Sequence, residues 1–199
     1  MELDMENSLW GMGYENIAFC DEVGRGCLFG PVLAASIILP KDLRIVGVRD
    51  SKKLSVKKRE EVYTIIKQNA LAIGIGIVSA KTIDEINIKN AARLAMKQSI
   101  ENLKDNRGVS IRPDYILVDA EQIKTNIPQK AIIKGDDLVH GIAAASIVAK
   151  VTRDRMCLEW DLLYPEYGIA KHKGYATKVH KEALRKFGVT DMHRKSFAR

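Results

Sequence analysis

The sequence predicts an α/β domain in which a mixed β-sheet is flanked by helices and followed by a helical C-terminal region. Short apolar runs with the length of strands alternate with longer amphipathic runs. A glycine-rich turn separates the first two apolar runs and favours a hairpin. Beyond residue 134, only helical patterns remain. The expected order is strand, strand, helix, strand, helix, strand, strand, helix, helix.

The first two strands are predicted over residues 16–23 and 31–39, and Pro40 ends the second. Ser55 is a suitable N-cap for a helix over residues 56–69.

Residues 71–78 alternate branched side chains with Ala or Gly, which is the period of a strand. The small residues on its second face predict that another element packs very close to it. Residues 82–85 match a capping box and predict the start of a helix that reaches about residue 103.

Residues 115–118 and 131–133 are predicted as short strands, and residues 138–163 as a long helix that stops before Pro165. Thr177 is expected to cap the last helix, which Gly188 ends. The side chains expected to face inward on this helix are Val179, Ala183, Leu184 and Phe187. We expect a short acidic leader over residues 1–15, a catalytic domain over 16–163, and a substrate-binding helical region over 164–199 packed on it.

The composition limits the class of protein. No apolar run reaches the roughly 18 residues needed to span a bilayer, so we expect no membrane association. Three cysteines without CxxC spacing and the absence of a signal peptide pattern indicate reduced thiols in a cytoplasmic protein. Four scattered histidines argue against a structural zinc site.

The net charge of +7 is concentrated in two blocks. Residues 150–199 hold twelve basic against six acidic residues, and residues 41–60 hold eight against three. Such basic blocks suggest a polyanionic partner such as nucleic acid.

Carboxylates follow three of the predicted strands: Asp21 with Glu22, Asp119, and Asp136. Clustered carboxylates repel one another unless a cation neutralises them, and oxygen-only ligands favour Mg²⁺ or Mn²⁺. Adjacent residues on a strand point to opposite faces, so Asp21 and Glu22 can share one site only if the strand bends or bulges, or if one of them contributes its backbone carbonyl.

The turn formed by Gly24, Arg25 and Gly26 exposes its backbone directly after two of these acids. Its spacing matches neither a Walker loop nor a dinucleotide-binding motif. The turn is therefore a candidate for contact with the sugar or phosphate of a nucleic acid at the metal site.

Several motifs occur in a specific order: CDEVGRGCLFGPVLAASIIL, RDSKKLS, ILVDA, KGD followed by IAAASIVAKVTRDR, and KHKGYATKVHKEAL with HRKSFA. Together they resemble type 2 ribonuclease H, the bacterial ribonuclease HII family, from about residue 17 to the end. The resemblance implies a ribonuclease H-like fold and an endonuclease that cuts RNA in RNA/DNA hybrids. It also implies nicking 5′ of single ribonucleotides in duplex DNA, with 3′-hydroxyl and 5′-phosphate ends.

The resemblance also implies roles for individual residues. Two divalent cations, Mn²⁺ or Mg²⁺, would be held by the catalytic Asp21, Glu22, Asp119 and Asp136. The turn at Gly24, Arg25 and Gly26 would sense the 2′-hydroxyl, and Tyr175 would pack on the next deoxyribose. The positions that would face the nucleic-acid backbone are Lys52, Lys53, Lys173 and Arg194.

The chain departs from the family pattern at Ala120, where glycine is usual, and at Cys20, where an aliphatic residue is common. We expect a monomer. The alternatives are the sister ribonuclease HIII type, which carries an extra N-terminal domain, and a nucleic-acid-binding module without catalysis. Acids at the ends of three strands favour an enzyme over such a module.

Overall fold

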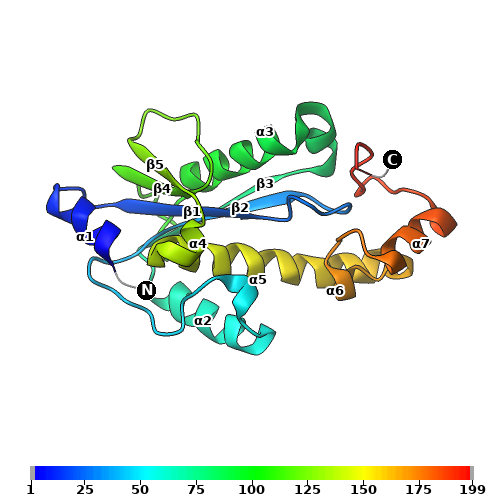
Figure 1. The fold of residues 1–199 in the computed structure, drawn as a ribbon, viewed down its shortest axis with the longest axis horizontal. Helices are drawn as coiled ribbons and strands as arrows, with labels where there is room; N and C mark the ends of the chain where they lie inside the picture. The colour runs from blue at the N-terminus through cyan, green and yellow to red at the C-terminus, as the bar shows by residue number, and fades with distance from the viewer. Residues whose placement is uncertain (1–2, 198–199) are drawn as a thin grey trace.

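The computed structural model describes residues 3–197 and forms the predicted mixed sheet with helices on both faces (Figure 1). The strands are β1 (Ile17–Val23), β2 (Val32–Ile38), β3 (Ala72–Val78), β4 (Tyr115–Asp119) and β5 (Gln129–Ile132). The α-helices are α1 (Asp4–Gly11), α2 (Val56–Asn69), α3 (Ala80–Glu101), α4 (Gly135–Leu138), α5 (His140–Leu163), α6 (Ile169–His172) and α7 (Lys178–Phe187). Two short 3₁₀ helices cover Ser51–Lys53 and Pro165–Tyr167.

The sheet has the order β3-β2-β1-β4-β5. Strands β1, β2 and β3 pair antiparallel, and the hairpin expected between the first two strands is confirmed. Strands β4 and β5 continue the sheet in parallel with β1. The carboxyl ends of β1 and β4 therefore meet at the same edge of the sheet.

Alternate residues of the central strands enter two separate cores, as the two-residue period of a strand requires. On one face, Phe19 and Leu33 pack with α1, α2 and α5. On the other face, Cys20 and Ala34 pack with α3. Helices thus cover both faces of the sheet and hold in place the edge where the carboxyl ends of β1 and β4 meet.

Most predicted elements are present, and the differences have local causes. Residues 3–11 were expected to belong to a leader, but α1 lies on the core and buries Leu9 and Trp10. Helix α3 begins at Ala80 rather than at the capping box, because the Ser79 side chain accepts a hydrogen bond from the Thr82 N–H. Its helical geometry is interrupted at Asn87, which has a φ of 65°.

The long helix expected over residues 138–163 is divided into α4 and α5 at Val139, whose backbone is extended. On α7, the prediction that Val179 and Phe187 face inward is wrong, since both side chains are about half exposed. Ala183 is buried as expected, and Thr177 caps the helix through its side chain.

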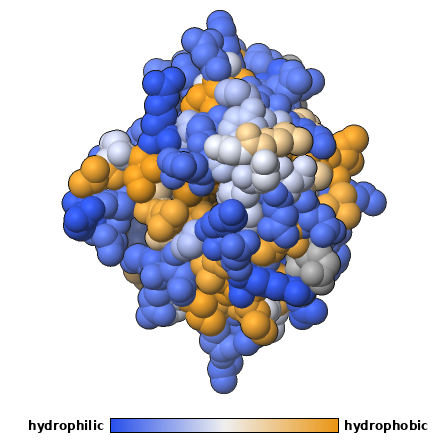
Figure 2. All heavy atoms as spheres, turned by 90° about the vertical axis from the view of Figure 1, so that its left-hand side faces the viewer, coloured by the Kyte–Doolittle hydropathy of each residue, from blue (hydrophilic) through white to orange (hydrophobic). Residues whose placement is uncertain are grey.

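The surface mixes polar and apolar residues. Figure 2 shows the end of the molecule that faces left in Figure 1, where hydrophobic residues form separate patches among hydrophilic ones. Among the described residues, no helix is both long and apolar enough to cross a membrane.

Candidate active site

Three carboxylates meet where β1 and β4 end. Asp21, Glu22 and Asp119 each offer an oxygen atom, and these atoms lie within 4.8 Å of one another. Asp21 is 5% exposed, and the other two are partly buried. The structure therefore brings together three of the four acids that the sequence singled out.

The two adjacent acids converge without a bulge. Strand β1 stays in regular register with β2 through Glu22↔Ala34 and Val23↔Leu33. Its pairing with β4, however, ends at Cys20↔Val118, so this side of β1 has no partner strand beside the acids. The Asp21 carboxylate accepts a hydrogen bond from the Glu22 N–H at 2.7 Å, which holds it along this open edge. The two carboxylates thus approach each other without a bulge in β1, where its pairing with β4 has ended.

Asp136 lies beside the cluster and does not join it in the structure. It sits in α4, where the Gly135 N–H donates to the Asp119 carboxylate at 2.7 Å. Its own carboxylate accepts from the Lys52 ammonium at 3.3 Å. Asp136 is near enough to Asp119 to raise the pKa of that carboxyl group, although burial contributes more.

The electrostatics of the cluster favour a bound cation. Burial, followed by repulsion from Glu22 and Asp119, raises the pKa of Asp21 well above its usual range. Burial also raises the pKa of Glu22, while Arg25 opposes that shift. The Glu22 Oε2 atom is buried and has no hydrogen-bond partner among the described residues. A divalent cation with oxygen ligands would satisfy this atom and neutralise the repulsion, so the donor set fits Mg²⁺ or Mn²⁺.

The glycine-rich turn follows the acids and lies next to Tyr175. A Cβ atom on Gly26 would come within 3.9 Å of the Tyr175 ring, which is about half exposed. Tyr175 also lines one pocket with Asp21 and Glu22. Gly24 has a φ of 90°, and an added Cβ would lie 2.4 Å from the Arg153 side chain, so both backbone geometry and packing require glycine there.

The four basic residues expected at the nucleic-acid backbone occupy different surroundings. Lys52 is largely exposed and pairs with Asp136, whereas Lys53 pairs with Asp137. Lys173 has a left-handed backbone, and its carbonyl accepts from Arg153. Arg194 is 0% exposed, so the expectation that its side chain faces the substrate is wrong. Three of its five N–H donors are used by backbone carbonyls, and its burial keeps the guanidinium away from a phosphate at the surface.

Comparisons with known proteins place the chain in a family. The profile of the Ribonuclease HII family matches residues 19–199. Ribonuclease HII of Alkaliphilus oremlandii is 64% identical over 98% of this chain and 96% of that protein. Ribonuclease HII of Alkaliphilus metalliredigens is 66% identical over the same shares. The chain belongs to the ribonuclease HII family. It is therefore a ribonuclease H endonuclease that acts on nucleic acid, as the motifs implied.

Solved structures agree with the ribonuclease HII assignment. The ribonuclease H2 of Pyrococcus horikoshii OT3 has a TM-score of 0.76 and 26% identity, over 92% of this chain and 95% of that one. A Bst-RNase HIII solved in complex with Mn²⁺ has a TM-score of 0.61 over 93% of this chain and 68% of that one. At 17% identity, this second likeness supports the fold alone.

One departure from the ribonuclease HII pattern has a structural consequence. Ala120, which follows the third acid, has a φ of 50°, a conformation that glycine adopts more easily. The other departure, Cys20, is fully buried, and burial raises the pKa of its thiol to about 12. Cys20 therefore behaves as an apolar residue behind the acids. All three cysteines are free thiols, as expected.

Several residues of the pocket beside Asp21 and Glu22 were not predicted from the sequence. Ser146 and Lys150 line it from one face of α5, and Ser51 donates to or accepts from Ser146 at 2.9 Å. Ser146 and Lys150 are four residues apart in a helix whose first half is otherwise apolar, so both lie on one helix face. This spacing was the signal in the sequence that could have identified them. Glu121 was also missed. It is buried and pairs with Arg25 at 3.2 Å and with Arg93 at 2.9 Å, which ties the turn to α3.

Proposed function

We propose that this endonuclease cuts the RNA strand of RNA/DNA hybrids and nicks duplex DNA on the 5′ side of a single embedded ribonucleotide. The products would carry 3′-hydroxyl and 5′-phosphate ends. The observation that carries the proposal is one pocket that holds Asp21, Glu22 and Tyr175 and adjoins Gly26. The acids proposed to hold the metal thus share a pocket with the tyrosine ring that borders the exposed turn, which supports the proposal.

The proposed cofactors are two divalent cations, Mg²⁺ or Mn²⁺, held by Asp21, Glu22, Asp119 and Asp136. When bound, such a pair supplies an activated water and stabilises the leaving oxygen of the phosphodiester. The orphaned Glu22 Oε2 supports this assignment. Asp136 would join the site by giving up its ion pair with Lys52, whose exposed ammonium can then turn to a phosphate.

Ribose recognition is assigned to the backbone of Gly24, Arg25 and Gly26. Only the 2′-hydroxyl distinguishes RNA from DNA at a given position, and a contact made to that group rejects a nucleotide without it. Tyr175 is half exposed beside this turn, and its ring can pack on the deoxyribose that follows. This arrangement favours a junction between RNA and DNA over a uniform duplex.

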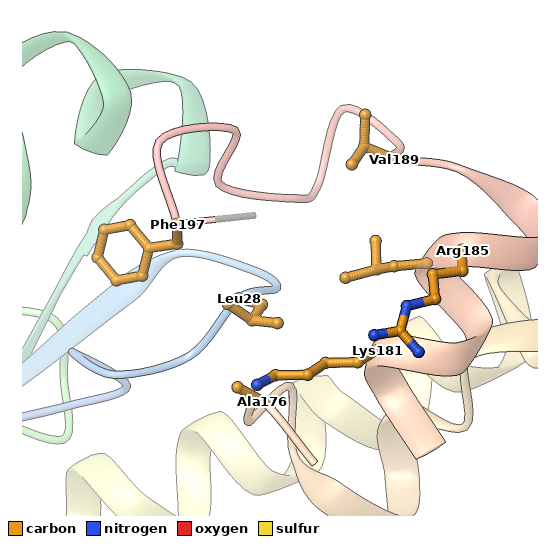
Figure 3. A pocket seen from close by; sticks show the side chains of 7 residues that line it. Leu28, Ala176, Lys181, Arg185, Val189 and Phe197 are labelled. Carbon is orange, nitrogen blue, oxygen red and sulfur yellow. The ribbon is translucent and has the colours of Figure 1, made fainter. Parts of the chain in front are cut away.

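The helical region over residues 164–199 is proposed to hold the rest of the duplex. A pocket of about 550 Å³ lies between α7 and the segment around Leu28. Figure 3 shows Lys181 and Arg185 at its α7 side. Ala176, next to Tyr175, also lines it. Lys181 and Arg185, together with Lys53 and Lys173, would track phosphates, so binding should weaken as salt rises. We further propose a monomer that works in the cytoplasm.

The test uses end-labelled duplex DNA with one ribonucleotide, incubated with Mg²⁺, with Mn²⁺, or with a chelator. We expect one metal-dependent nick on the 5′ side of the ribonucleotide and no cleavage of the all-DNA duplex. Asp21→Asn should abolish the nick while hybrid binding persists, because it removes one ligand charge and leaves the basic surface intact. Asp4→Asn, at an exposed aspartate in the first turn of α1, is the matched control and should cut normally.

Each other outcome has a definite meaning. Cleavage confined to long RNA/DNA tracts would refute the roles given to the turn and Tyr175. No cleavage of either substrate would refute the proposed reaction. If the parent chain bound hybrids without cutting them, the binding-module alternative would stand.

A further inference from the structure

Arg194 is a buried cation whose side-chain hydrogen bonds within the described residues all go to backbone carbonyls, and its guanidinium also lies over the Phe197 ring, 5.3 Å from the centroid. Its Nη2 donates to the Gly24 carbonyl at 2.7 Å, its Nη1 to the Arg25 carbonyl at 2.7 Å, and its Nε to the Gly30 carbonyl at 2.9 Å. No carboxylate forms an ion pair with it within residues 3–197. A fully buried guanidinium with three carbonyl partners is costly to desolvate, and burial lowers its pKa to about 10. Because burying this guanidinium is costly, we expect Arg194 to have a function other than carrying charge at the surface.

The carbonyls that Arg194 binds define the direction of two peptide groups. In a trans peptide, the C=O and the N–H point in opposite directions. The Gly24 carbonyl shares its peptide with the Arg25 N–H, and the Arg25 carbonyl shares its peptide with the Gly26 N–H. With both carbonyls turned inward on Arg194, both N–H groups point away from it. Neither N–H donates to an acceptor in the described part of the chain, and Gly26 is exposed.

The charge on Arg194 also strengthens these donors. A hydrogen bond from a charged donor polarises the peptide that accepts it, and polarisation passes along hydrogen-bonded chains. The Arg25 and Gly26 N–H groups are therefore better donors than those of an ordinary turn. They lie beside the acids, where the sugar of the cut nucleotide would sit under the proposed function.

A second buried arginine, Arg153, packs against the same turn. Arg153 is 1% exposed and donates to the carbonyls of Phe29 at 3.1 Å and Lys173 at 2.8 Å. It also packs against Gly24, where it leaves no room for a Cβ. Lys173 lies two residues before Tyr175. Arg153 thus joins the turn to the loop that carries the tyrosine, and it prevents the turn from shifting away from Arg194.

We propose that Arg194 is a positioning residue for ribose specificity, which aims and polarises the N–H groups of Arg25 and Gly26 at the 2′-hydroxyl. This proposal rests on the ribose recognition assigned above to the turn. It gives Arg194 no contact with the substrate. It also predicts that the geometry of the guanidinium matters, because one ammonium cannot reach three carbonyls in a fixed fork.

The test measures binding in the inactive Asp21→Asn background. Dissociation constants are compared for two duplexes of one sequence, with and without a single ribonucleotide. We expect Asp21→Asn to prefer the ribonucleotide. Adding Arg194→Lys should reduce that preference by about 10-fold or more, since a small misplacement has effects of up to about 100-fold. Affinity for the all-DNA duplex should not change, and far-UV circular dichroism should confirm folding. Arg107→Ala, at an exposed arginine in the loop after α3, is the control that should keep the preference.

A rescue experiment covers the case in which the lysine variant is unstable. Arg194→Ala in the active chain should nick the ribonucleotide substrate at least about 10-fold more slowly. Millimolar guanidinium chloride should restore part of this rate by filling the cavity, whereas ammonium chloride at the same ionic strength should not.

The outcomes separate the two proposals. If Asp21→Asn shows no preference for the ribonucleotide, ribose recognition by the turn is wrong and the role of Arg194 fails with it. If that preference exists and persists in Arg194→Lys, or if guanidinium does not restore Arg194→Ala, ribose recognition stands and the role of Arg194 is refuted.

Discussion

Two histidines show how burial changes the interpretation of a residue. His180 and His193 lie in a strongly basic stretch of the sequence, yet they are 0% and 1% exposed. His180 Nδ1 donates to the Tyr175 carbonyl at 2.9 Å, so its Nε2 is free to accept from His193 Nε2 at 3.3 Å. His193 Nδ1 in turn accepts from the Thr190 N–H at 3.0 Å. This chain of bonds requires both rings to be neutral.

The neutral His193 ring predicts a pH-dependent stability. Burial lowers its pKa to about 4, against about 6.5 in an unfolded chain. Between these values the unfolded chain binds the proton and the folded chain does not, so the free energy of unfolding rises with pH. The contribution is complete above about pH 6.5 and is lost as pH falls towards about 4. Urea unfolding from pH 7 to 5 should show a free energy of unfolding that rises with pH, and His193→Gln should reduce this slope by up to about 1.4 kcal/mol per pH unit, most strongly below about pH 6.

The other titrating groups away from this ring, such as His140, are common to both chains and cancel in the difference. Parallel pH curves for the parent and His193→Gln would show that the ring is not held neutral.

At the scale of elements, α3 lies unusually close to β3. A Cβ on Gly76 would lie 1.9 Å from the Ala95 carbonyl oxygen, and one on Gly74 would lie 2.0 Å from that of Ser99. The alternation of glycine in this strand predicted such a close approach, and the structure confirms it. The strand face and the helix backbone are in direct contact, which sets the position of α3 on the sheet.

Gly76→Ala should therefore destabilise the fold by about 3 kcal/mol, because the backbone of α3 has to move away from the sheet. The measurement is urea unfolding followed by circular dichroism. Gly11→Ala is the matched control, because no atom lies within 4 Å of the Cβ position of Gly11 in α1. The free energy of unfolding of this variant should equal that of the parent or exceed it by up to about 1 kcal/mol. Equal stability for both variants would contradict the close packing of α3.

At the scale of the whole molecule, the C-terminal region is tied to the hairpin of β1 and β2. The Leu28 N–H donates to the Gly174 carbonyl, and the Gly30 N–H donates to the Met192 carbonyl, both at 2.8 Å. Between them, Phe29 is fully buried in a small core with Trp160 and Tyr167. The substrate-binding region proposed for residues 164–199 therefore shares a core with the connection that follows β1, the strand of Asp21 and Glu22.

This shared core predicts a single cooperative unfolding transition. Trp10 reports on the core beneath α1, and Trp160 reports on the core around Phe29. Trp160→Phe leaves the first reporter and Trp10→Phe leaves the second. Within each variant, the denaturant midpoint from fluorescence should coincide with that from circular dichroism. Earlier loss of Trp160 fluorescence than of circular dichroism would show that the C-terminal region unfolds independently.

The sequence by itself determined the elements and the family. Strand and helix periods are local properties, so β1, β2, β3, α2 and α5 could be predicted from the order of apolar residues. The acids at Asp21, Glu22 and Asp119 could be predicted to meet, because the ends of neighbouring strands meet at one edge. The ordered motifs identified the ribonuclease HII family before any geometry was known.

Only the tertiary structure decided what several individual side chains do. Arg194 and Gly24 are separated by 170 residues, so no local period reveals that one binds the carbonyl of the other. The end of β4 beside Asp21, the burial of His193 and the pairing of Asp136 with Lys52 likewise depend on which segments meet. Burial and hydrogen bonding arise from contacts between distant segments, and these contacts turned a presumed phosphate ligand into the support of a turn.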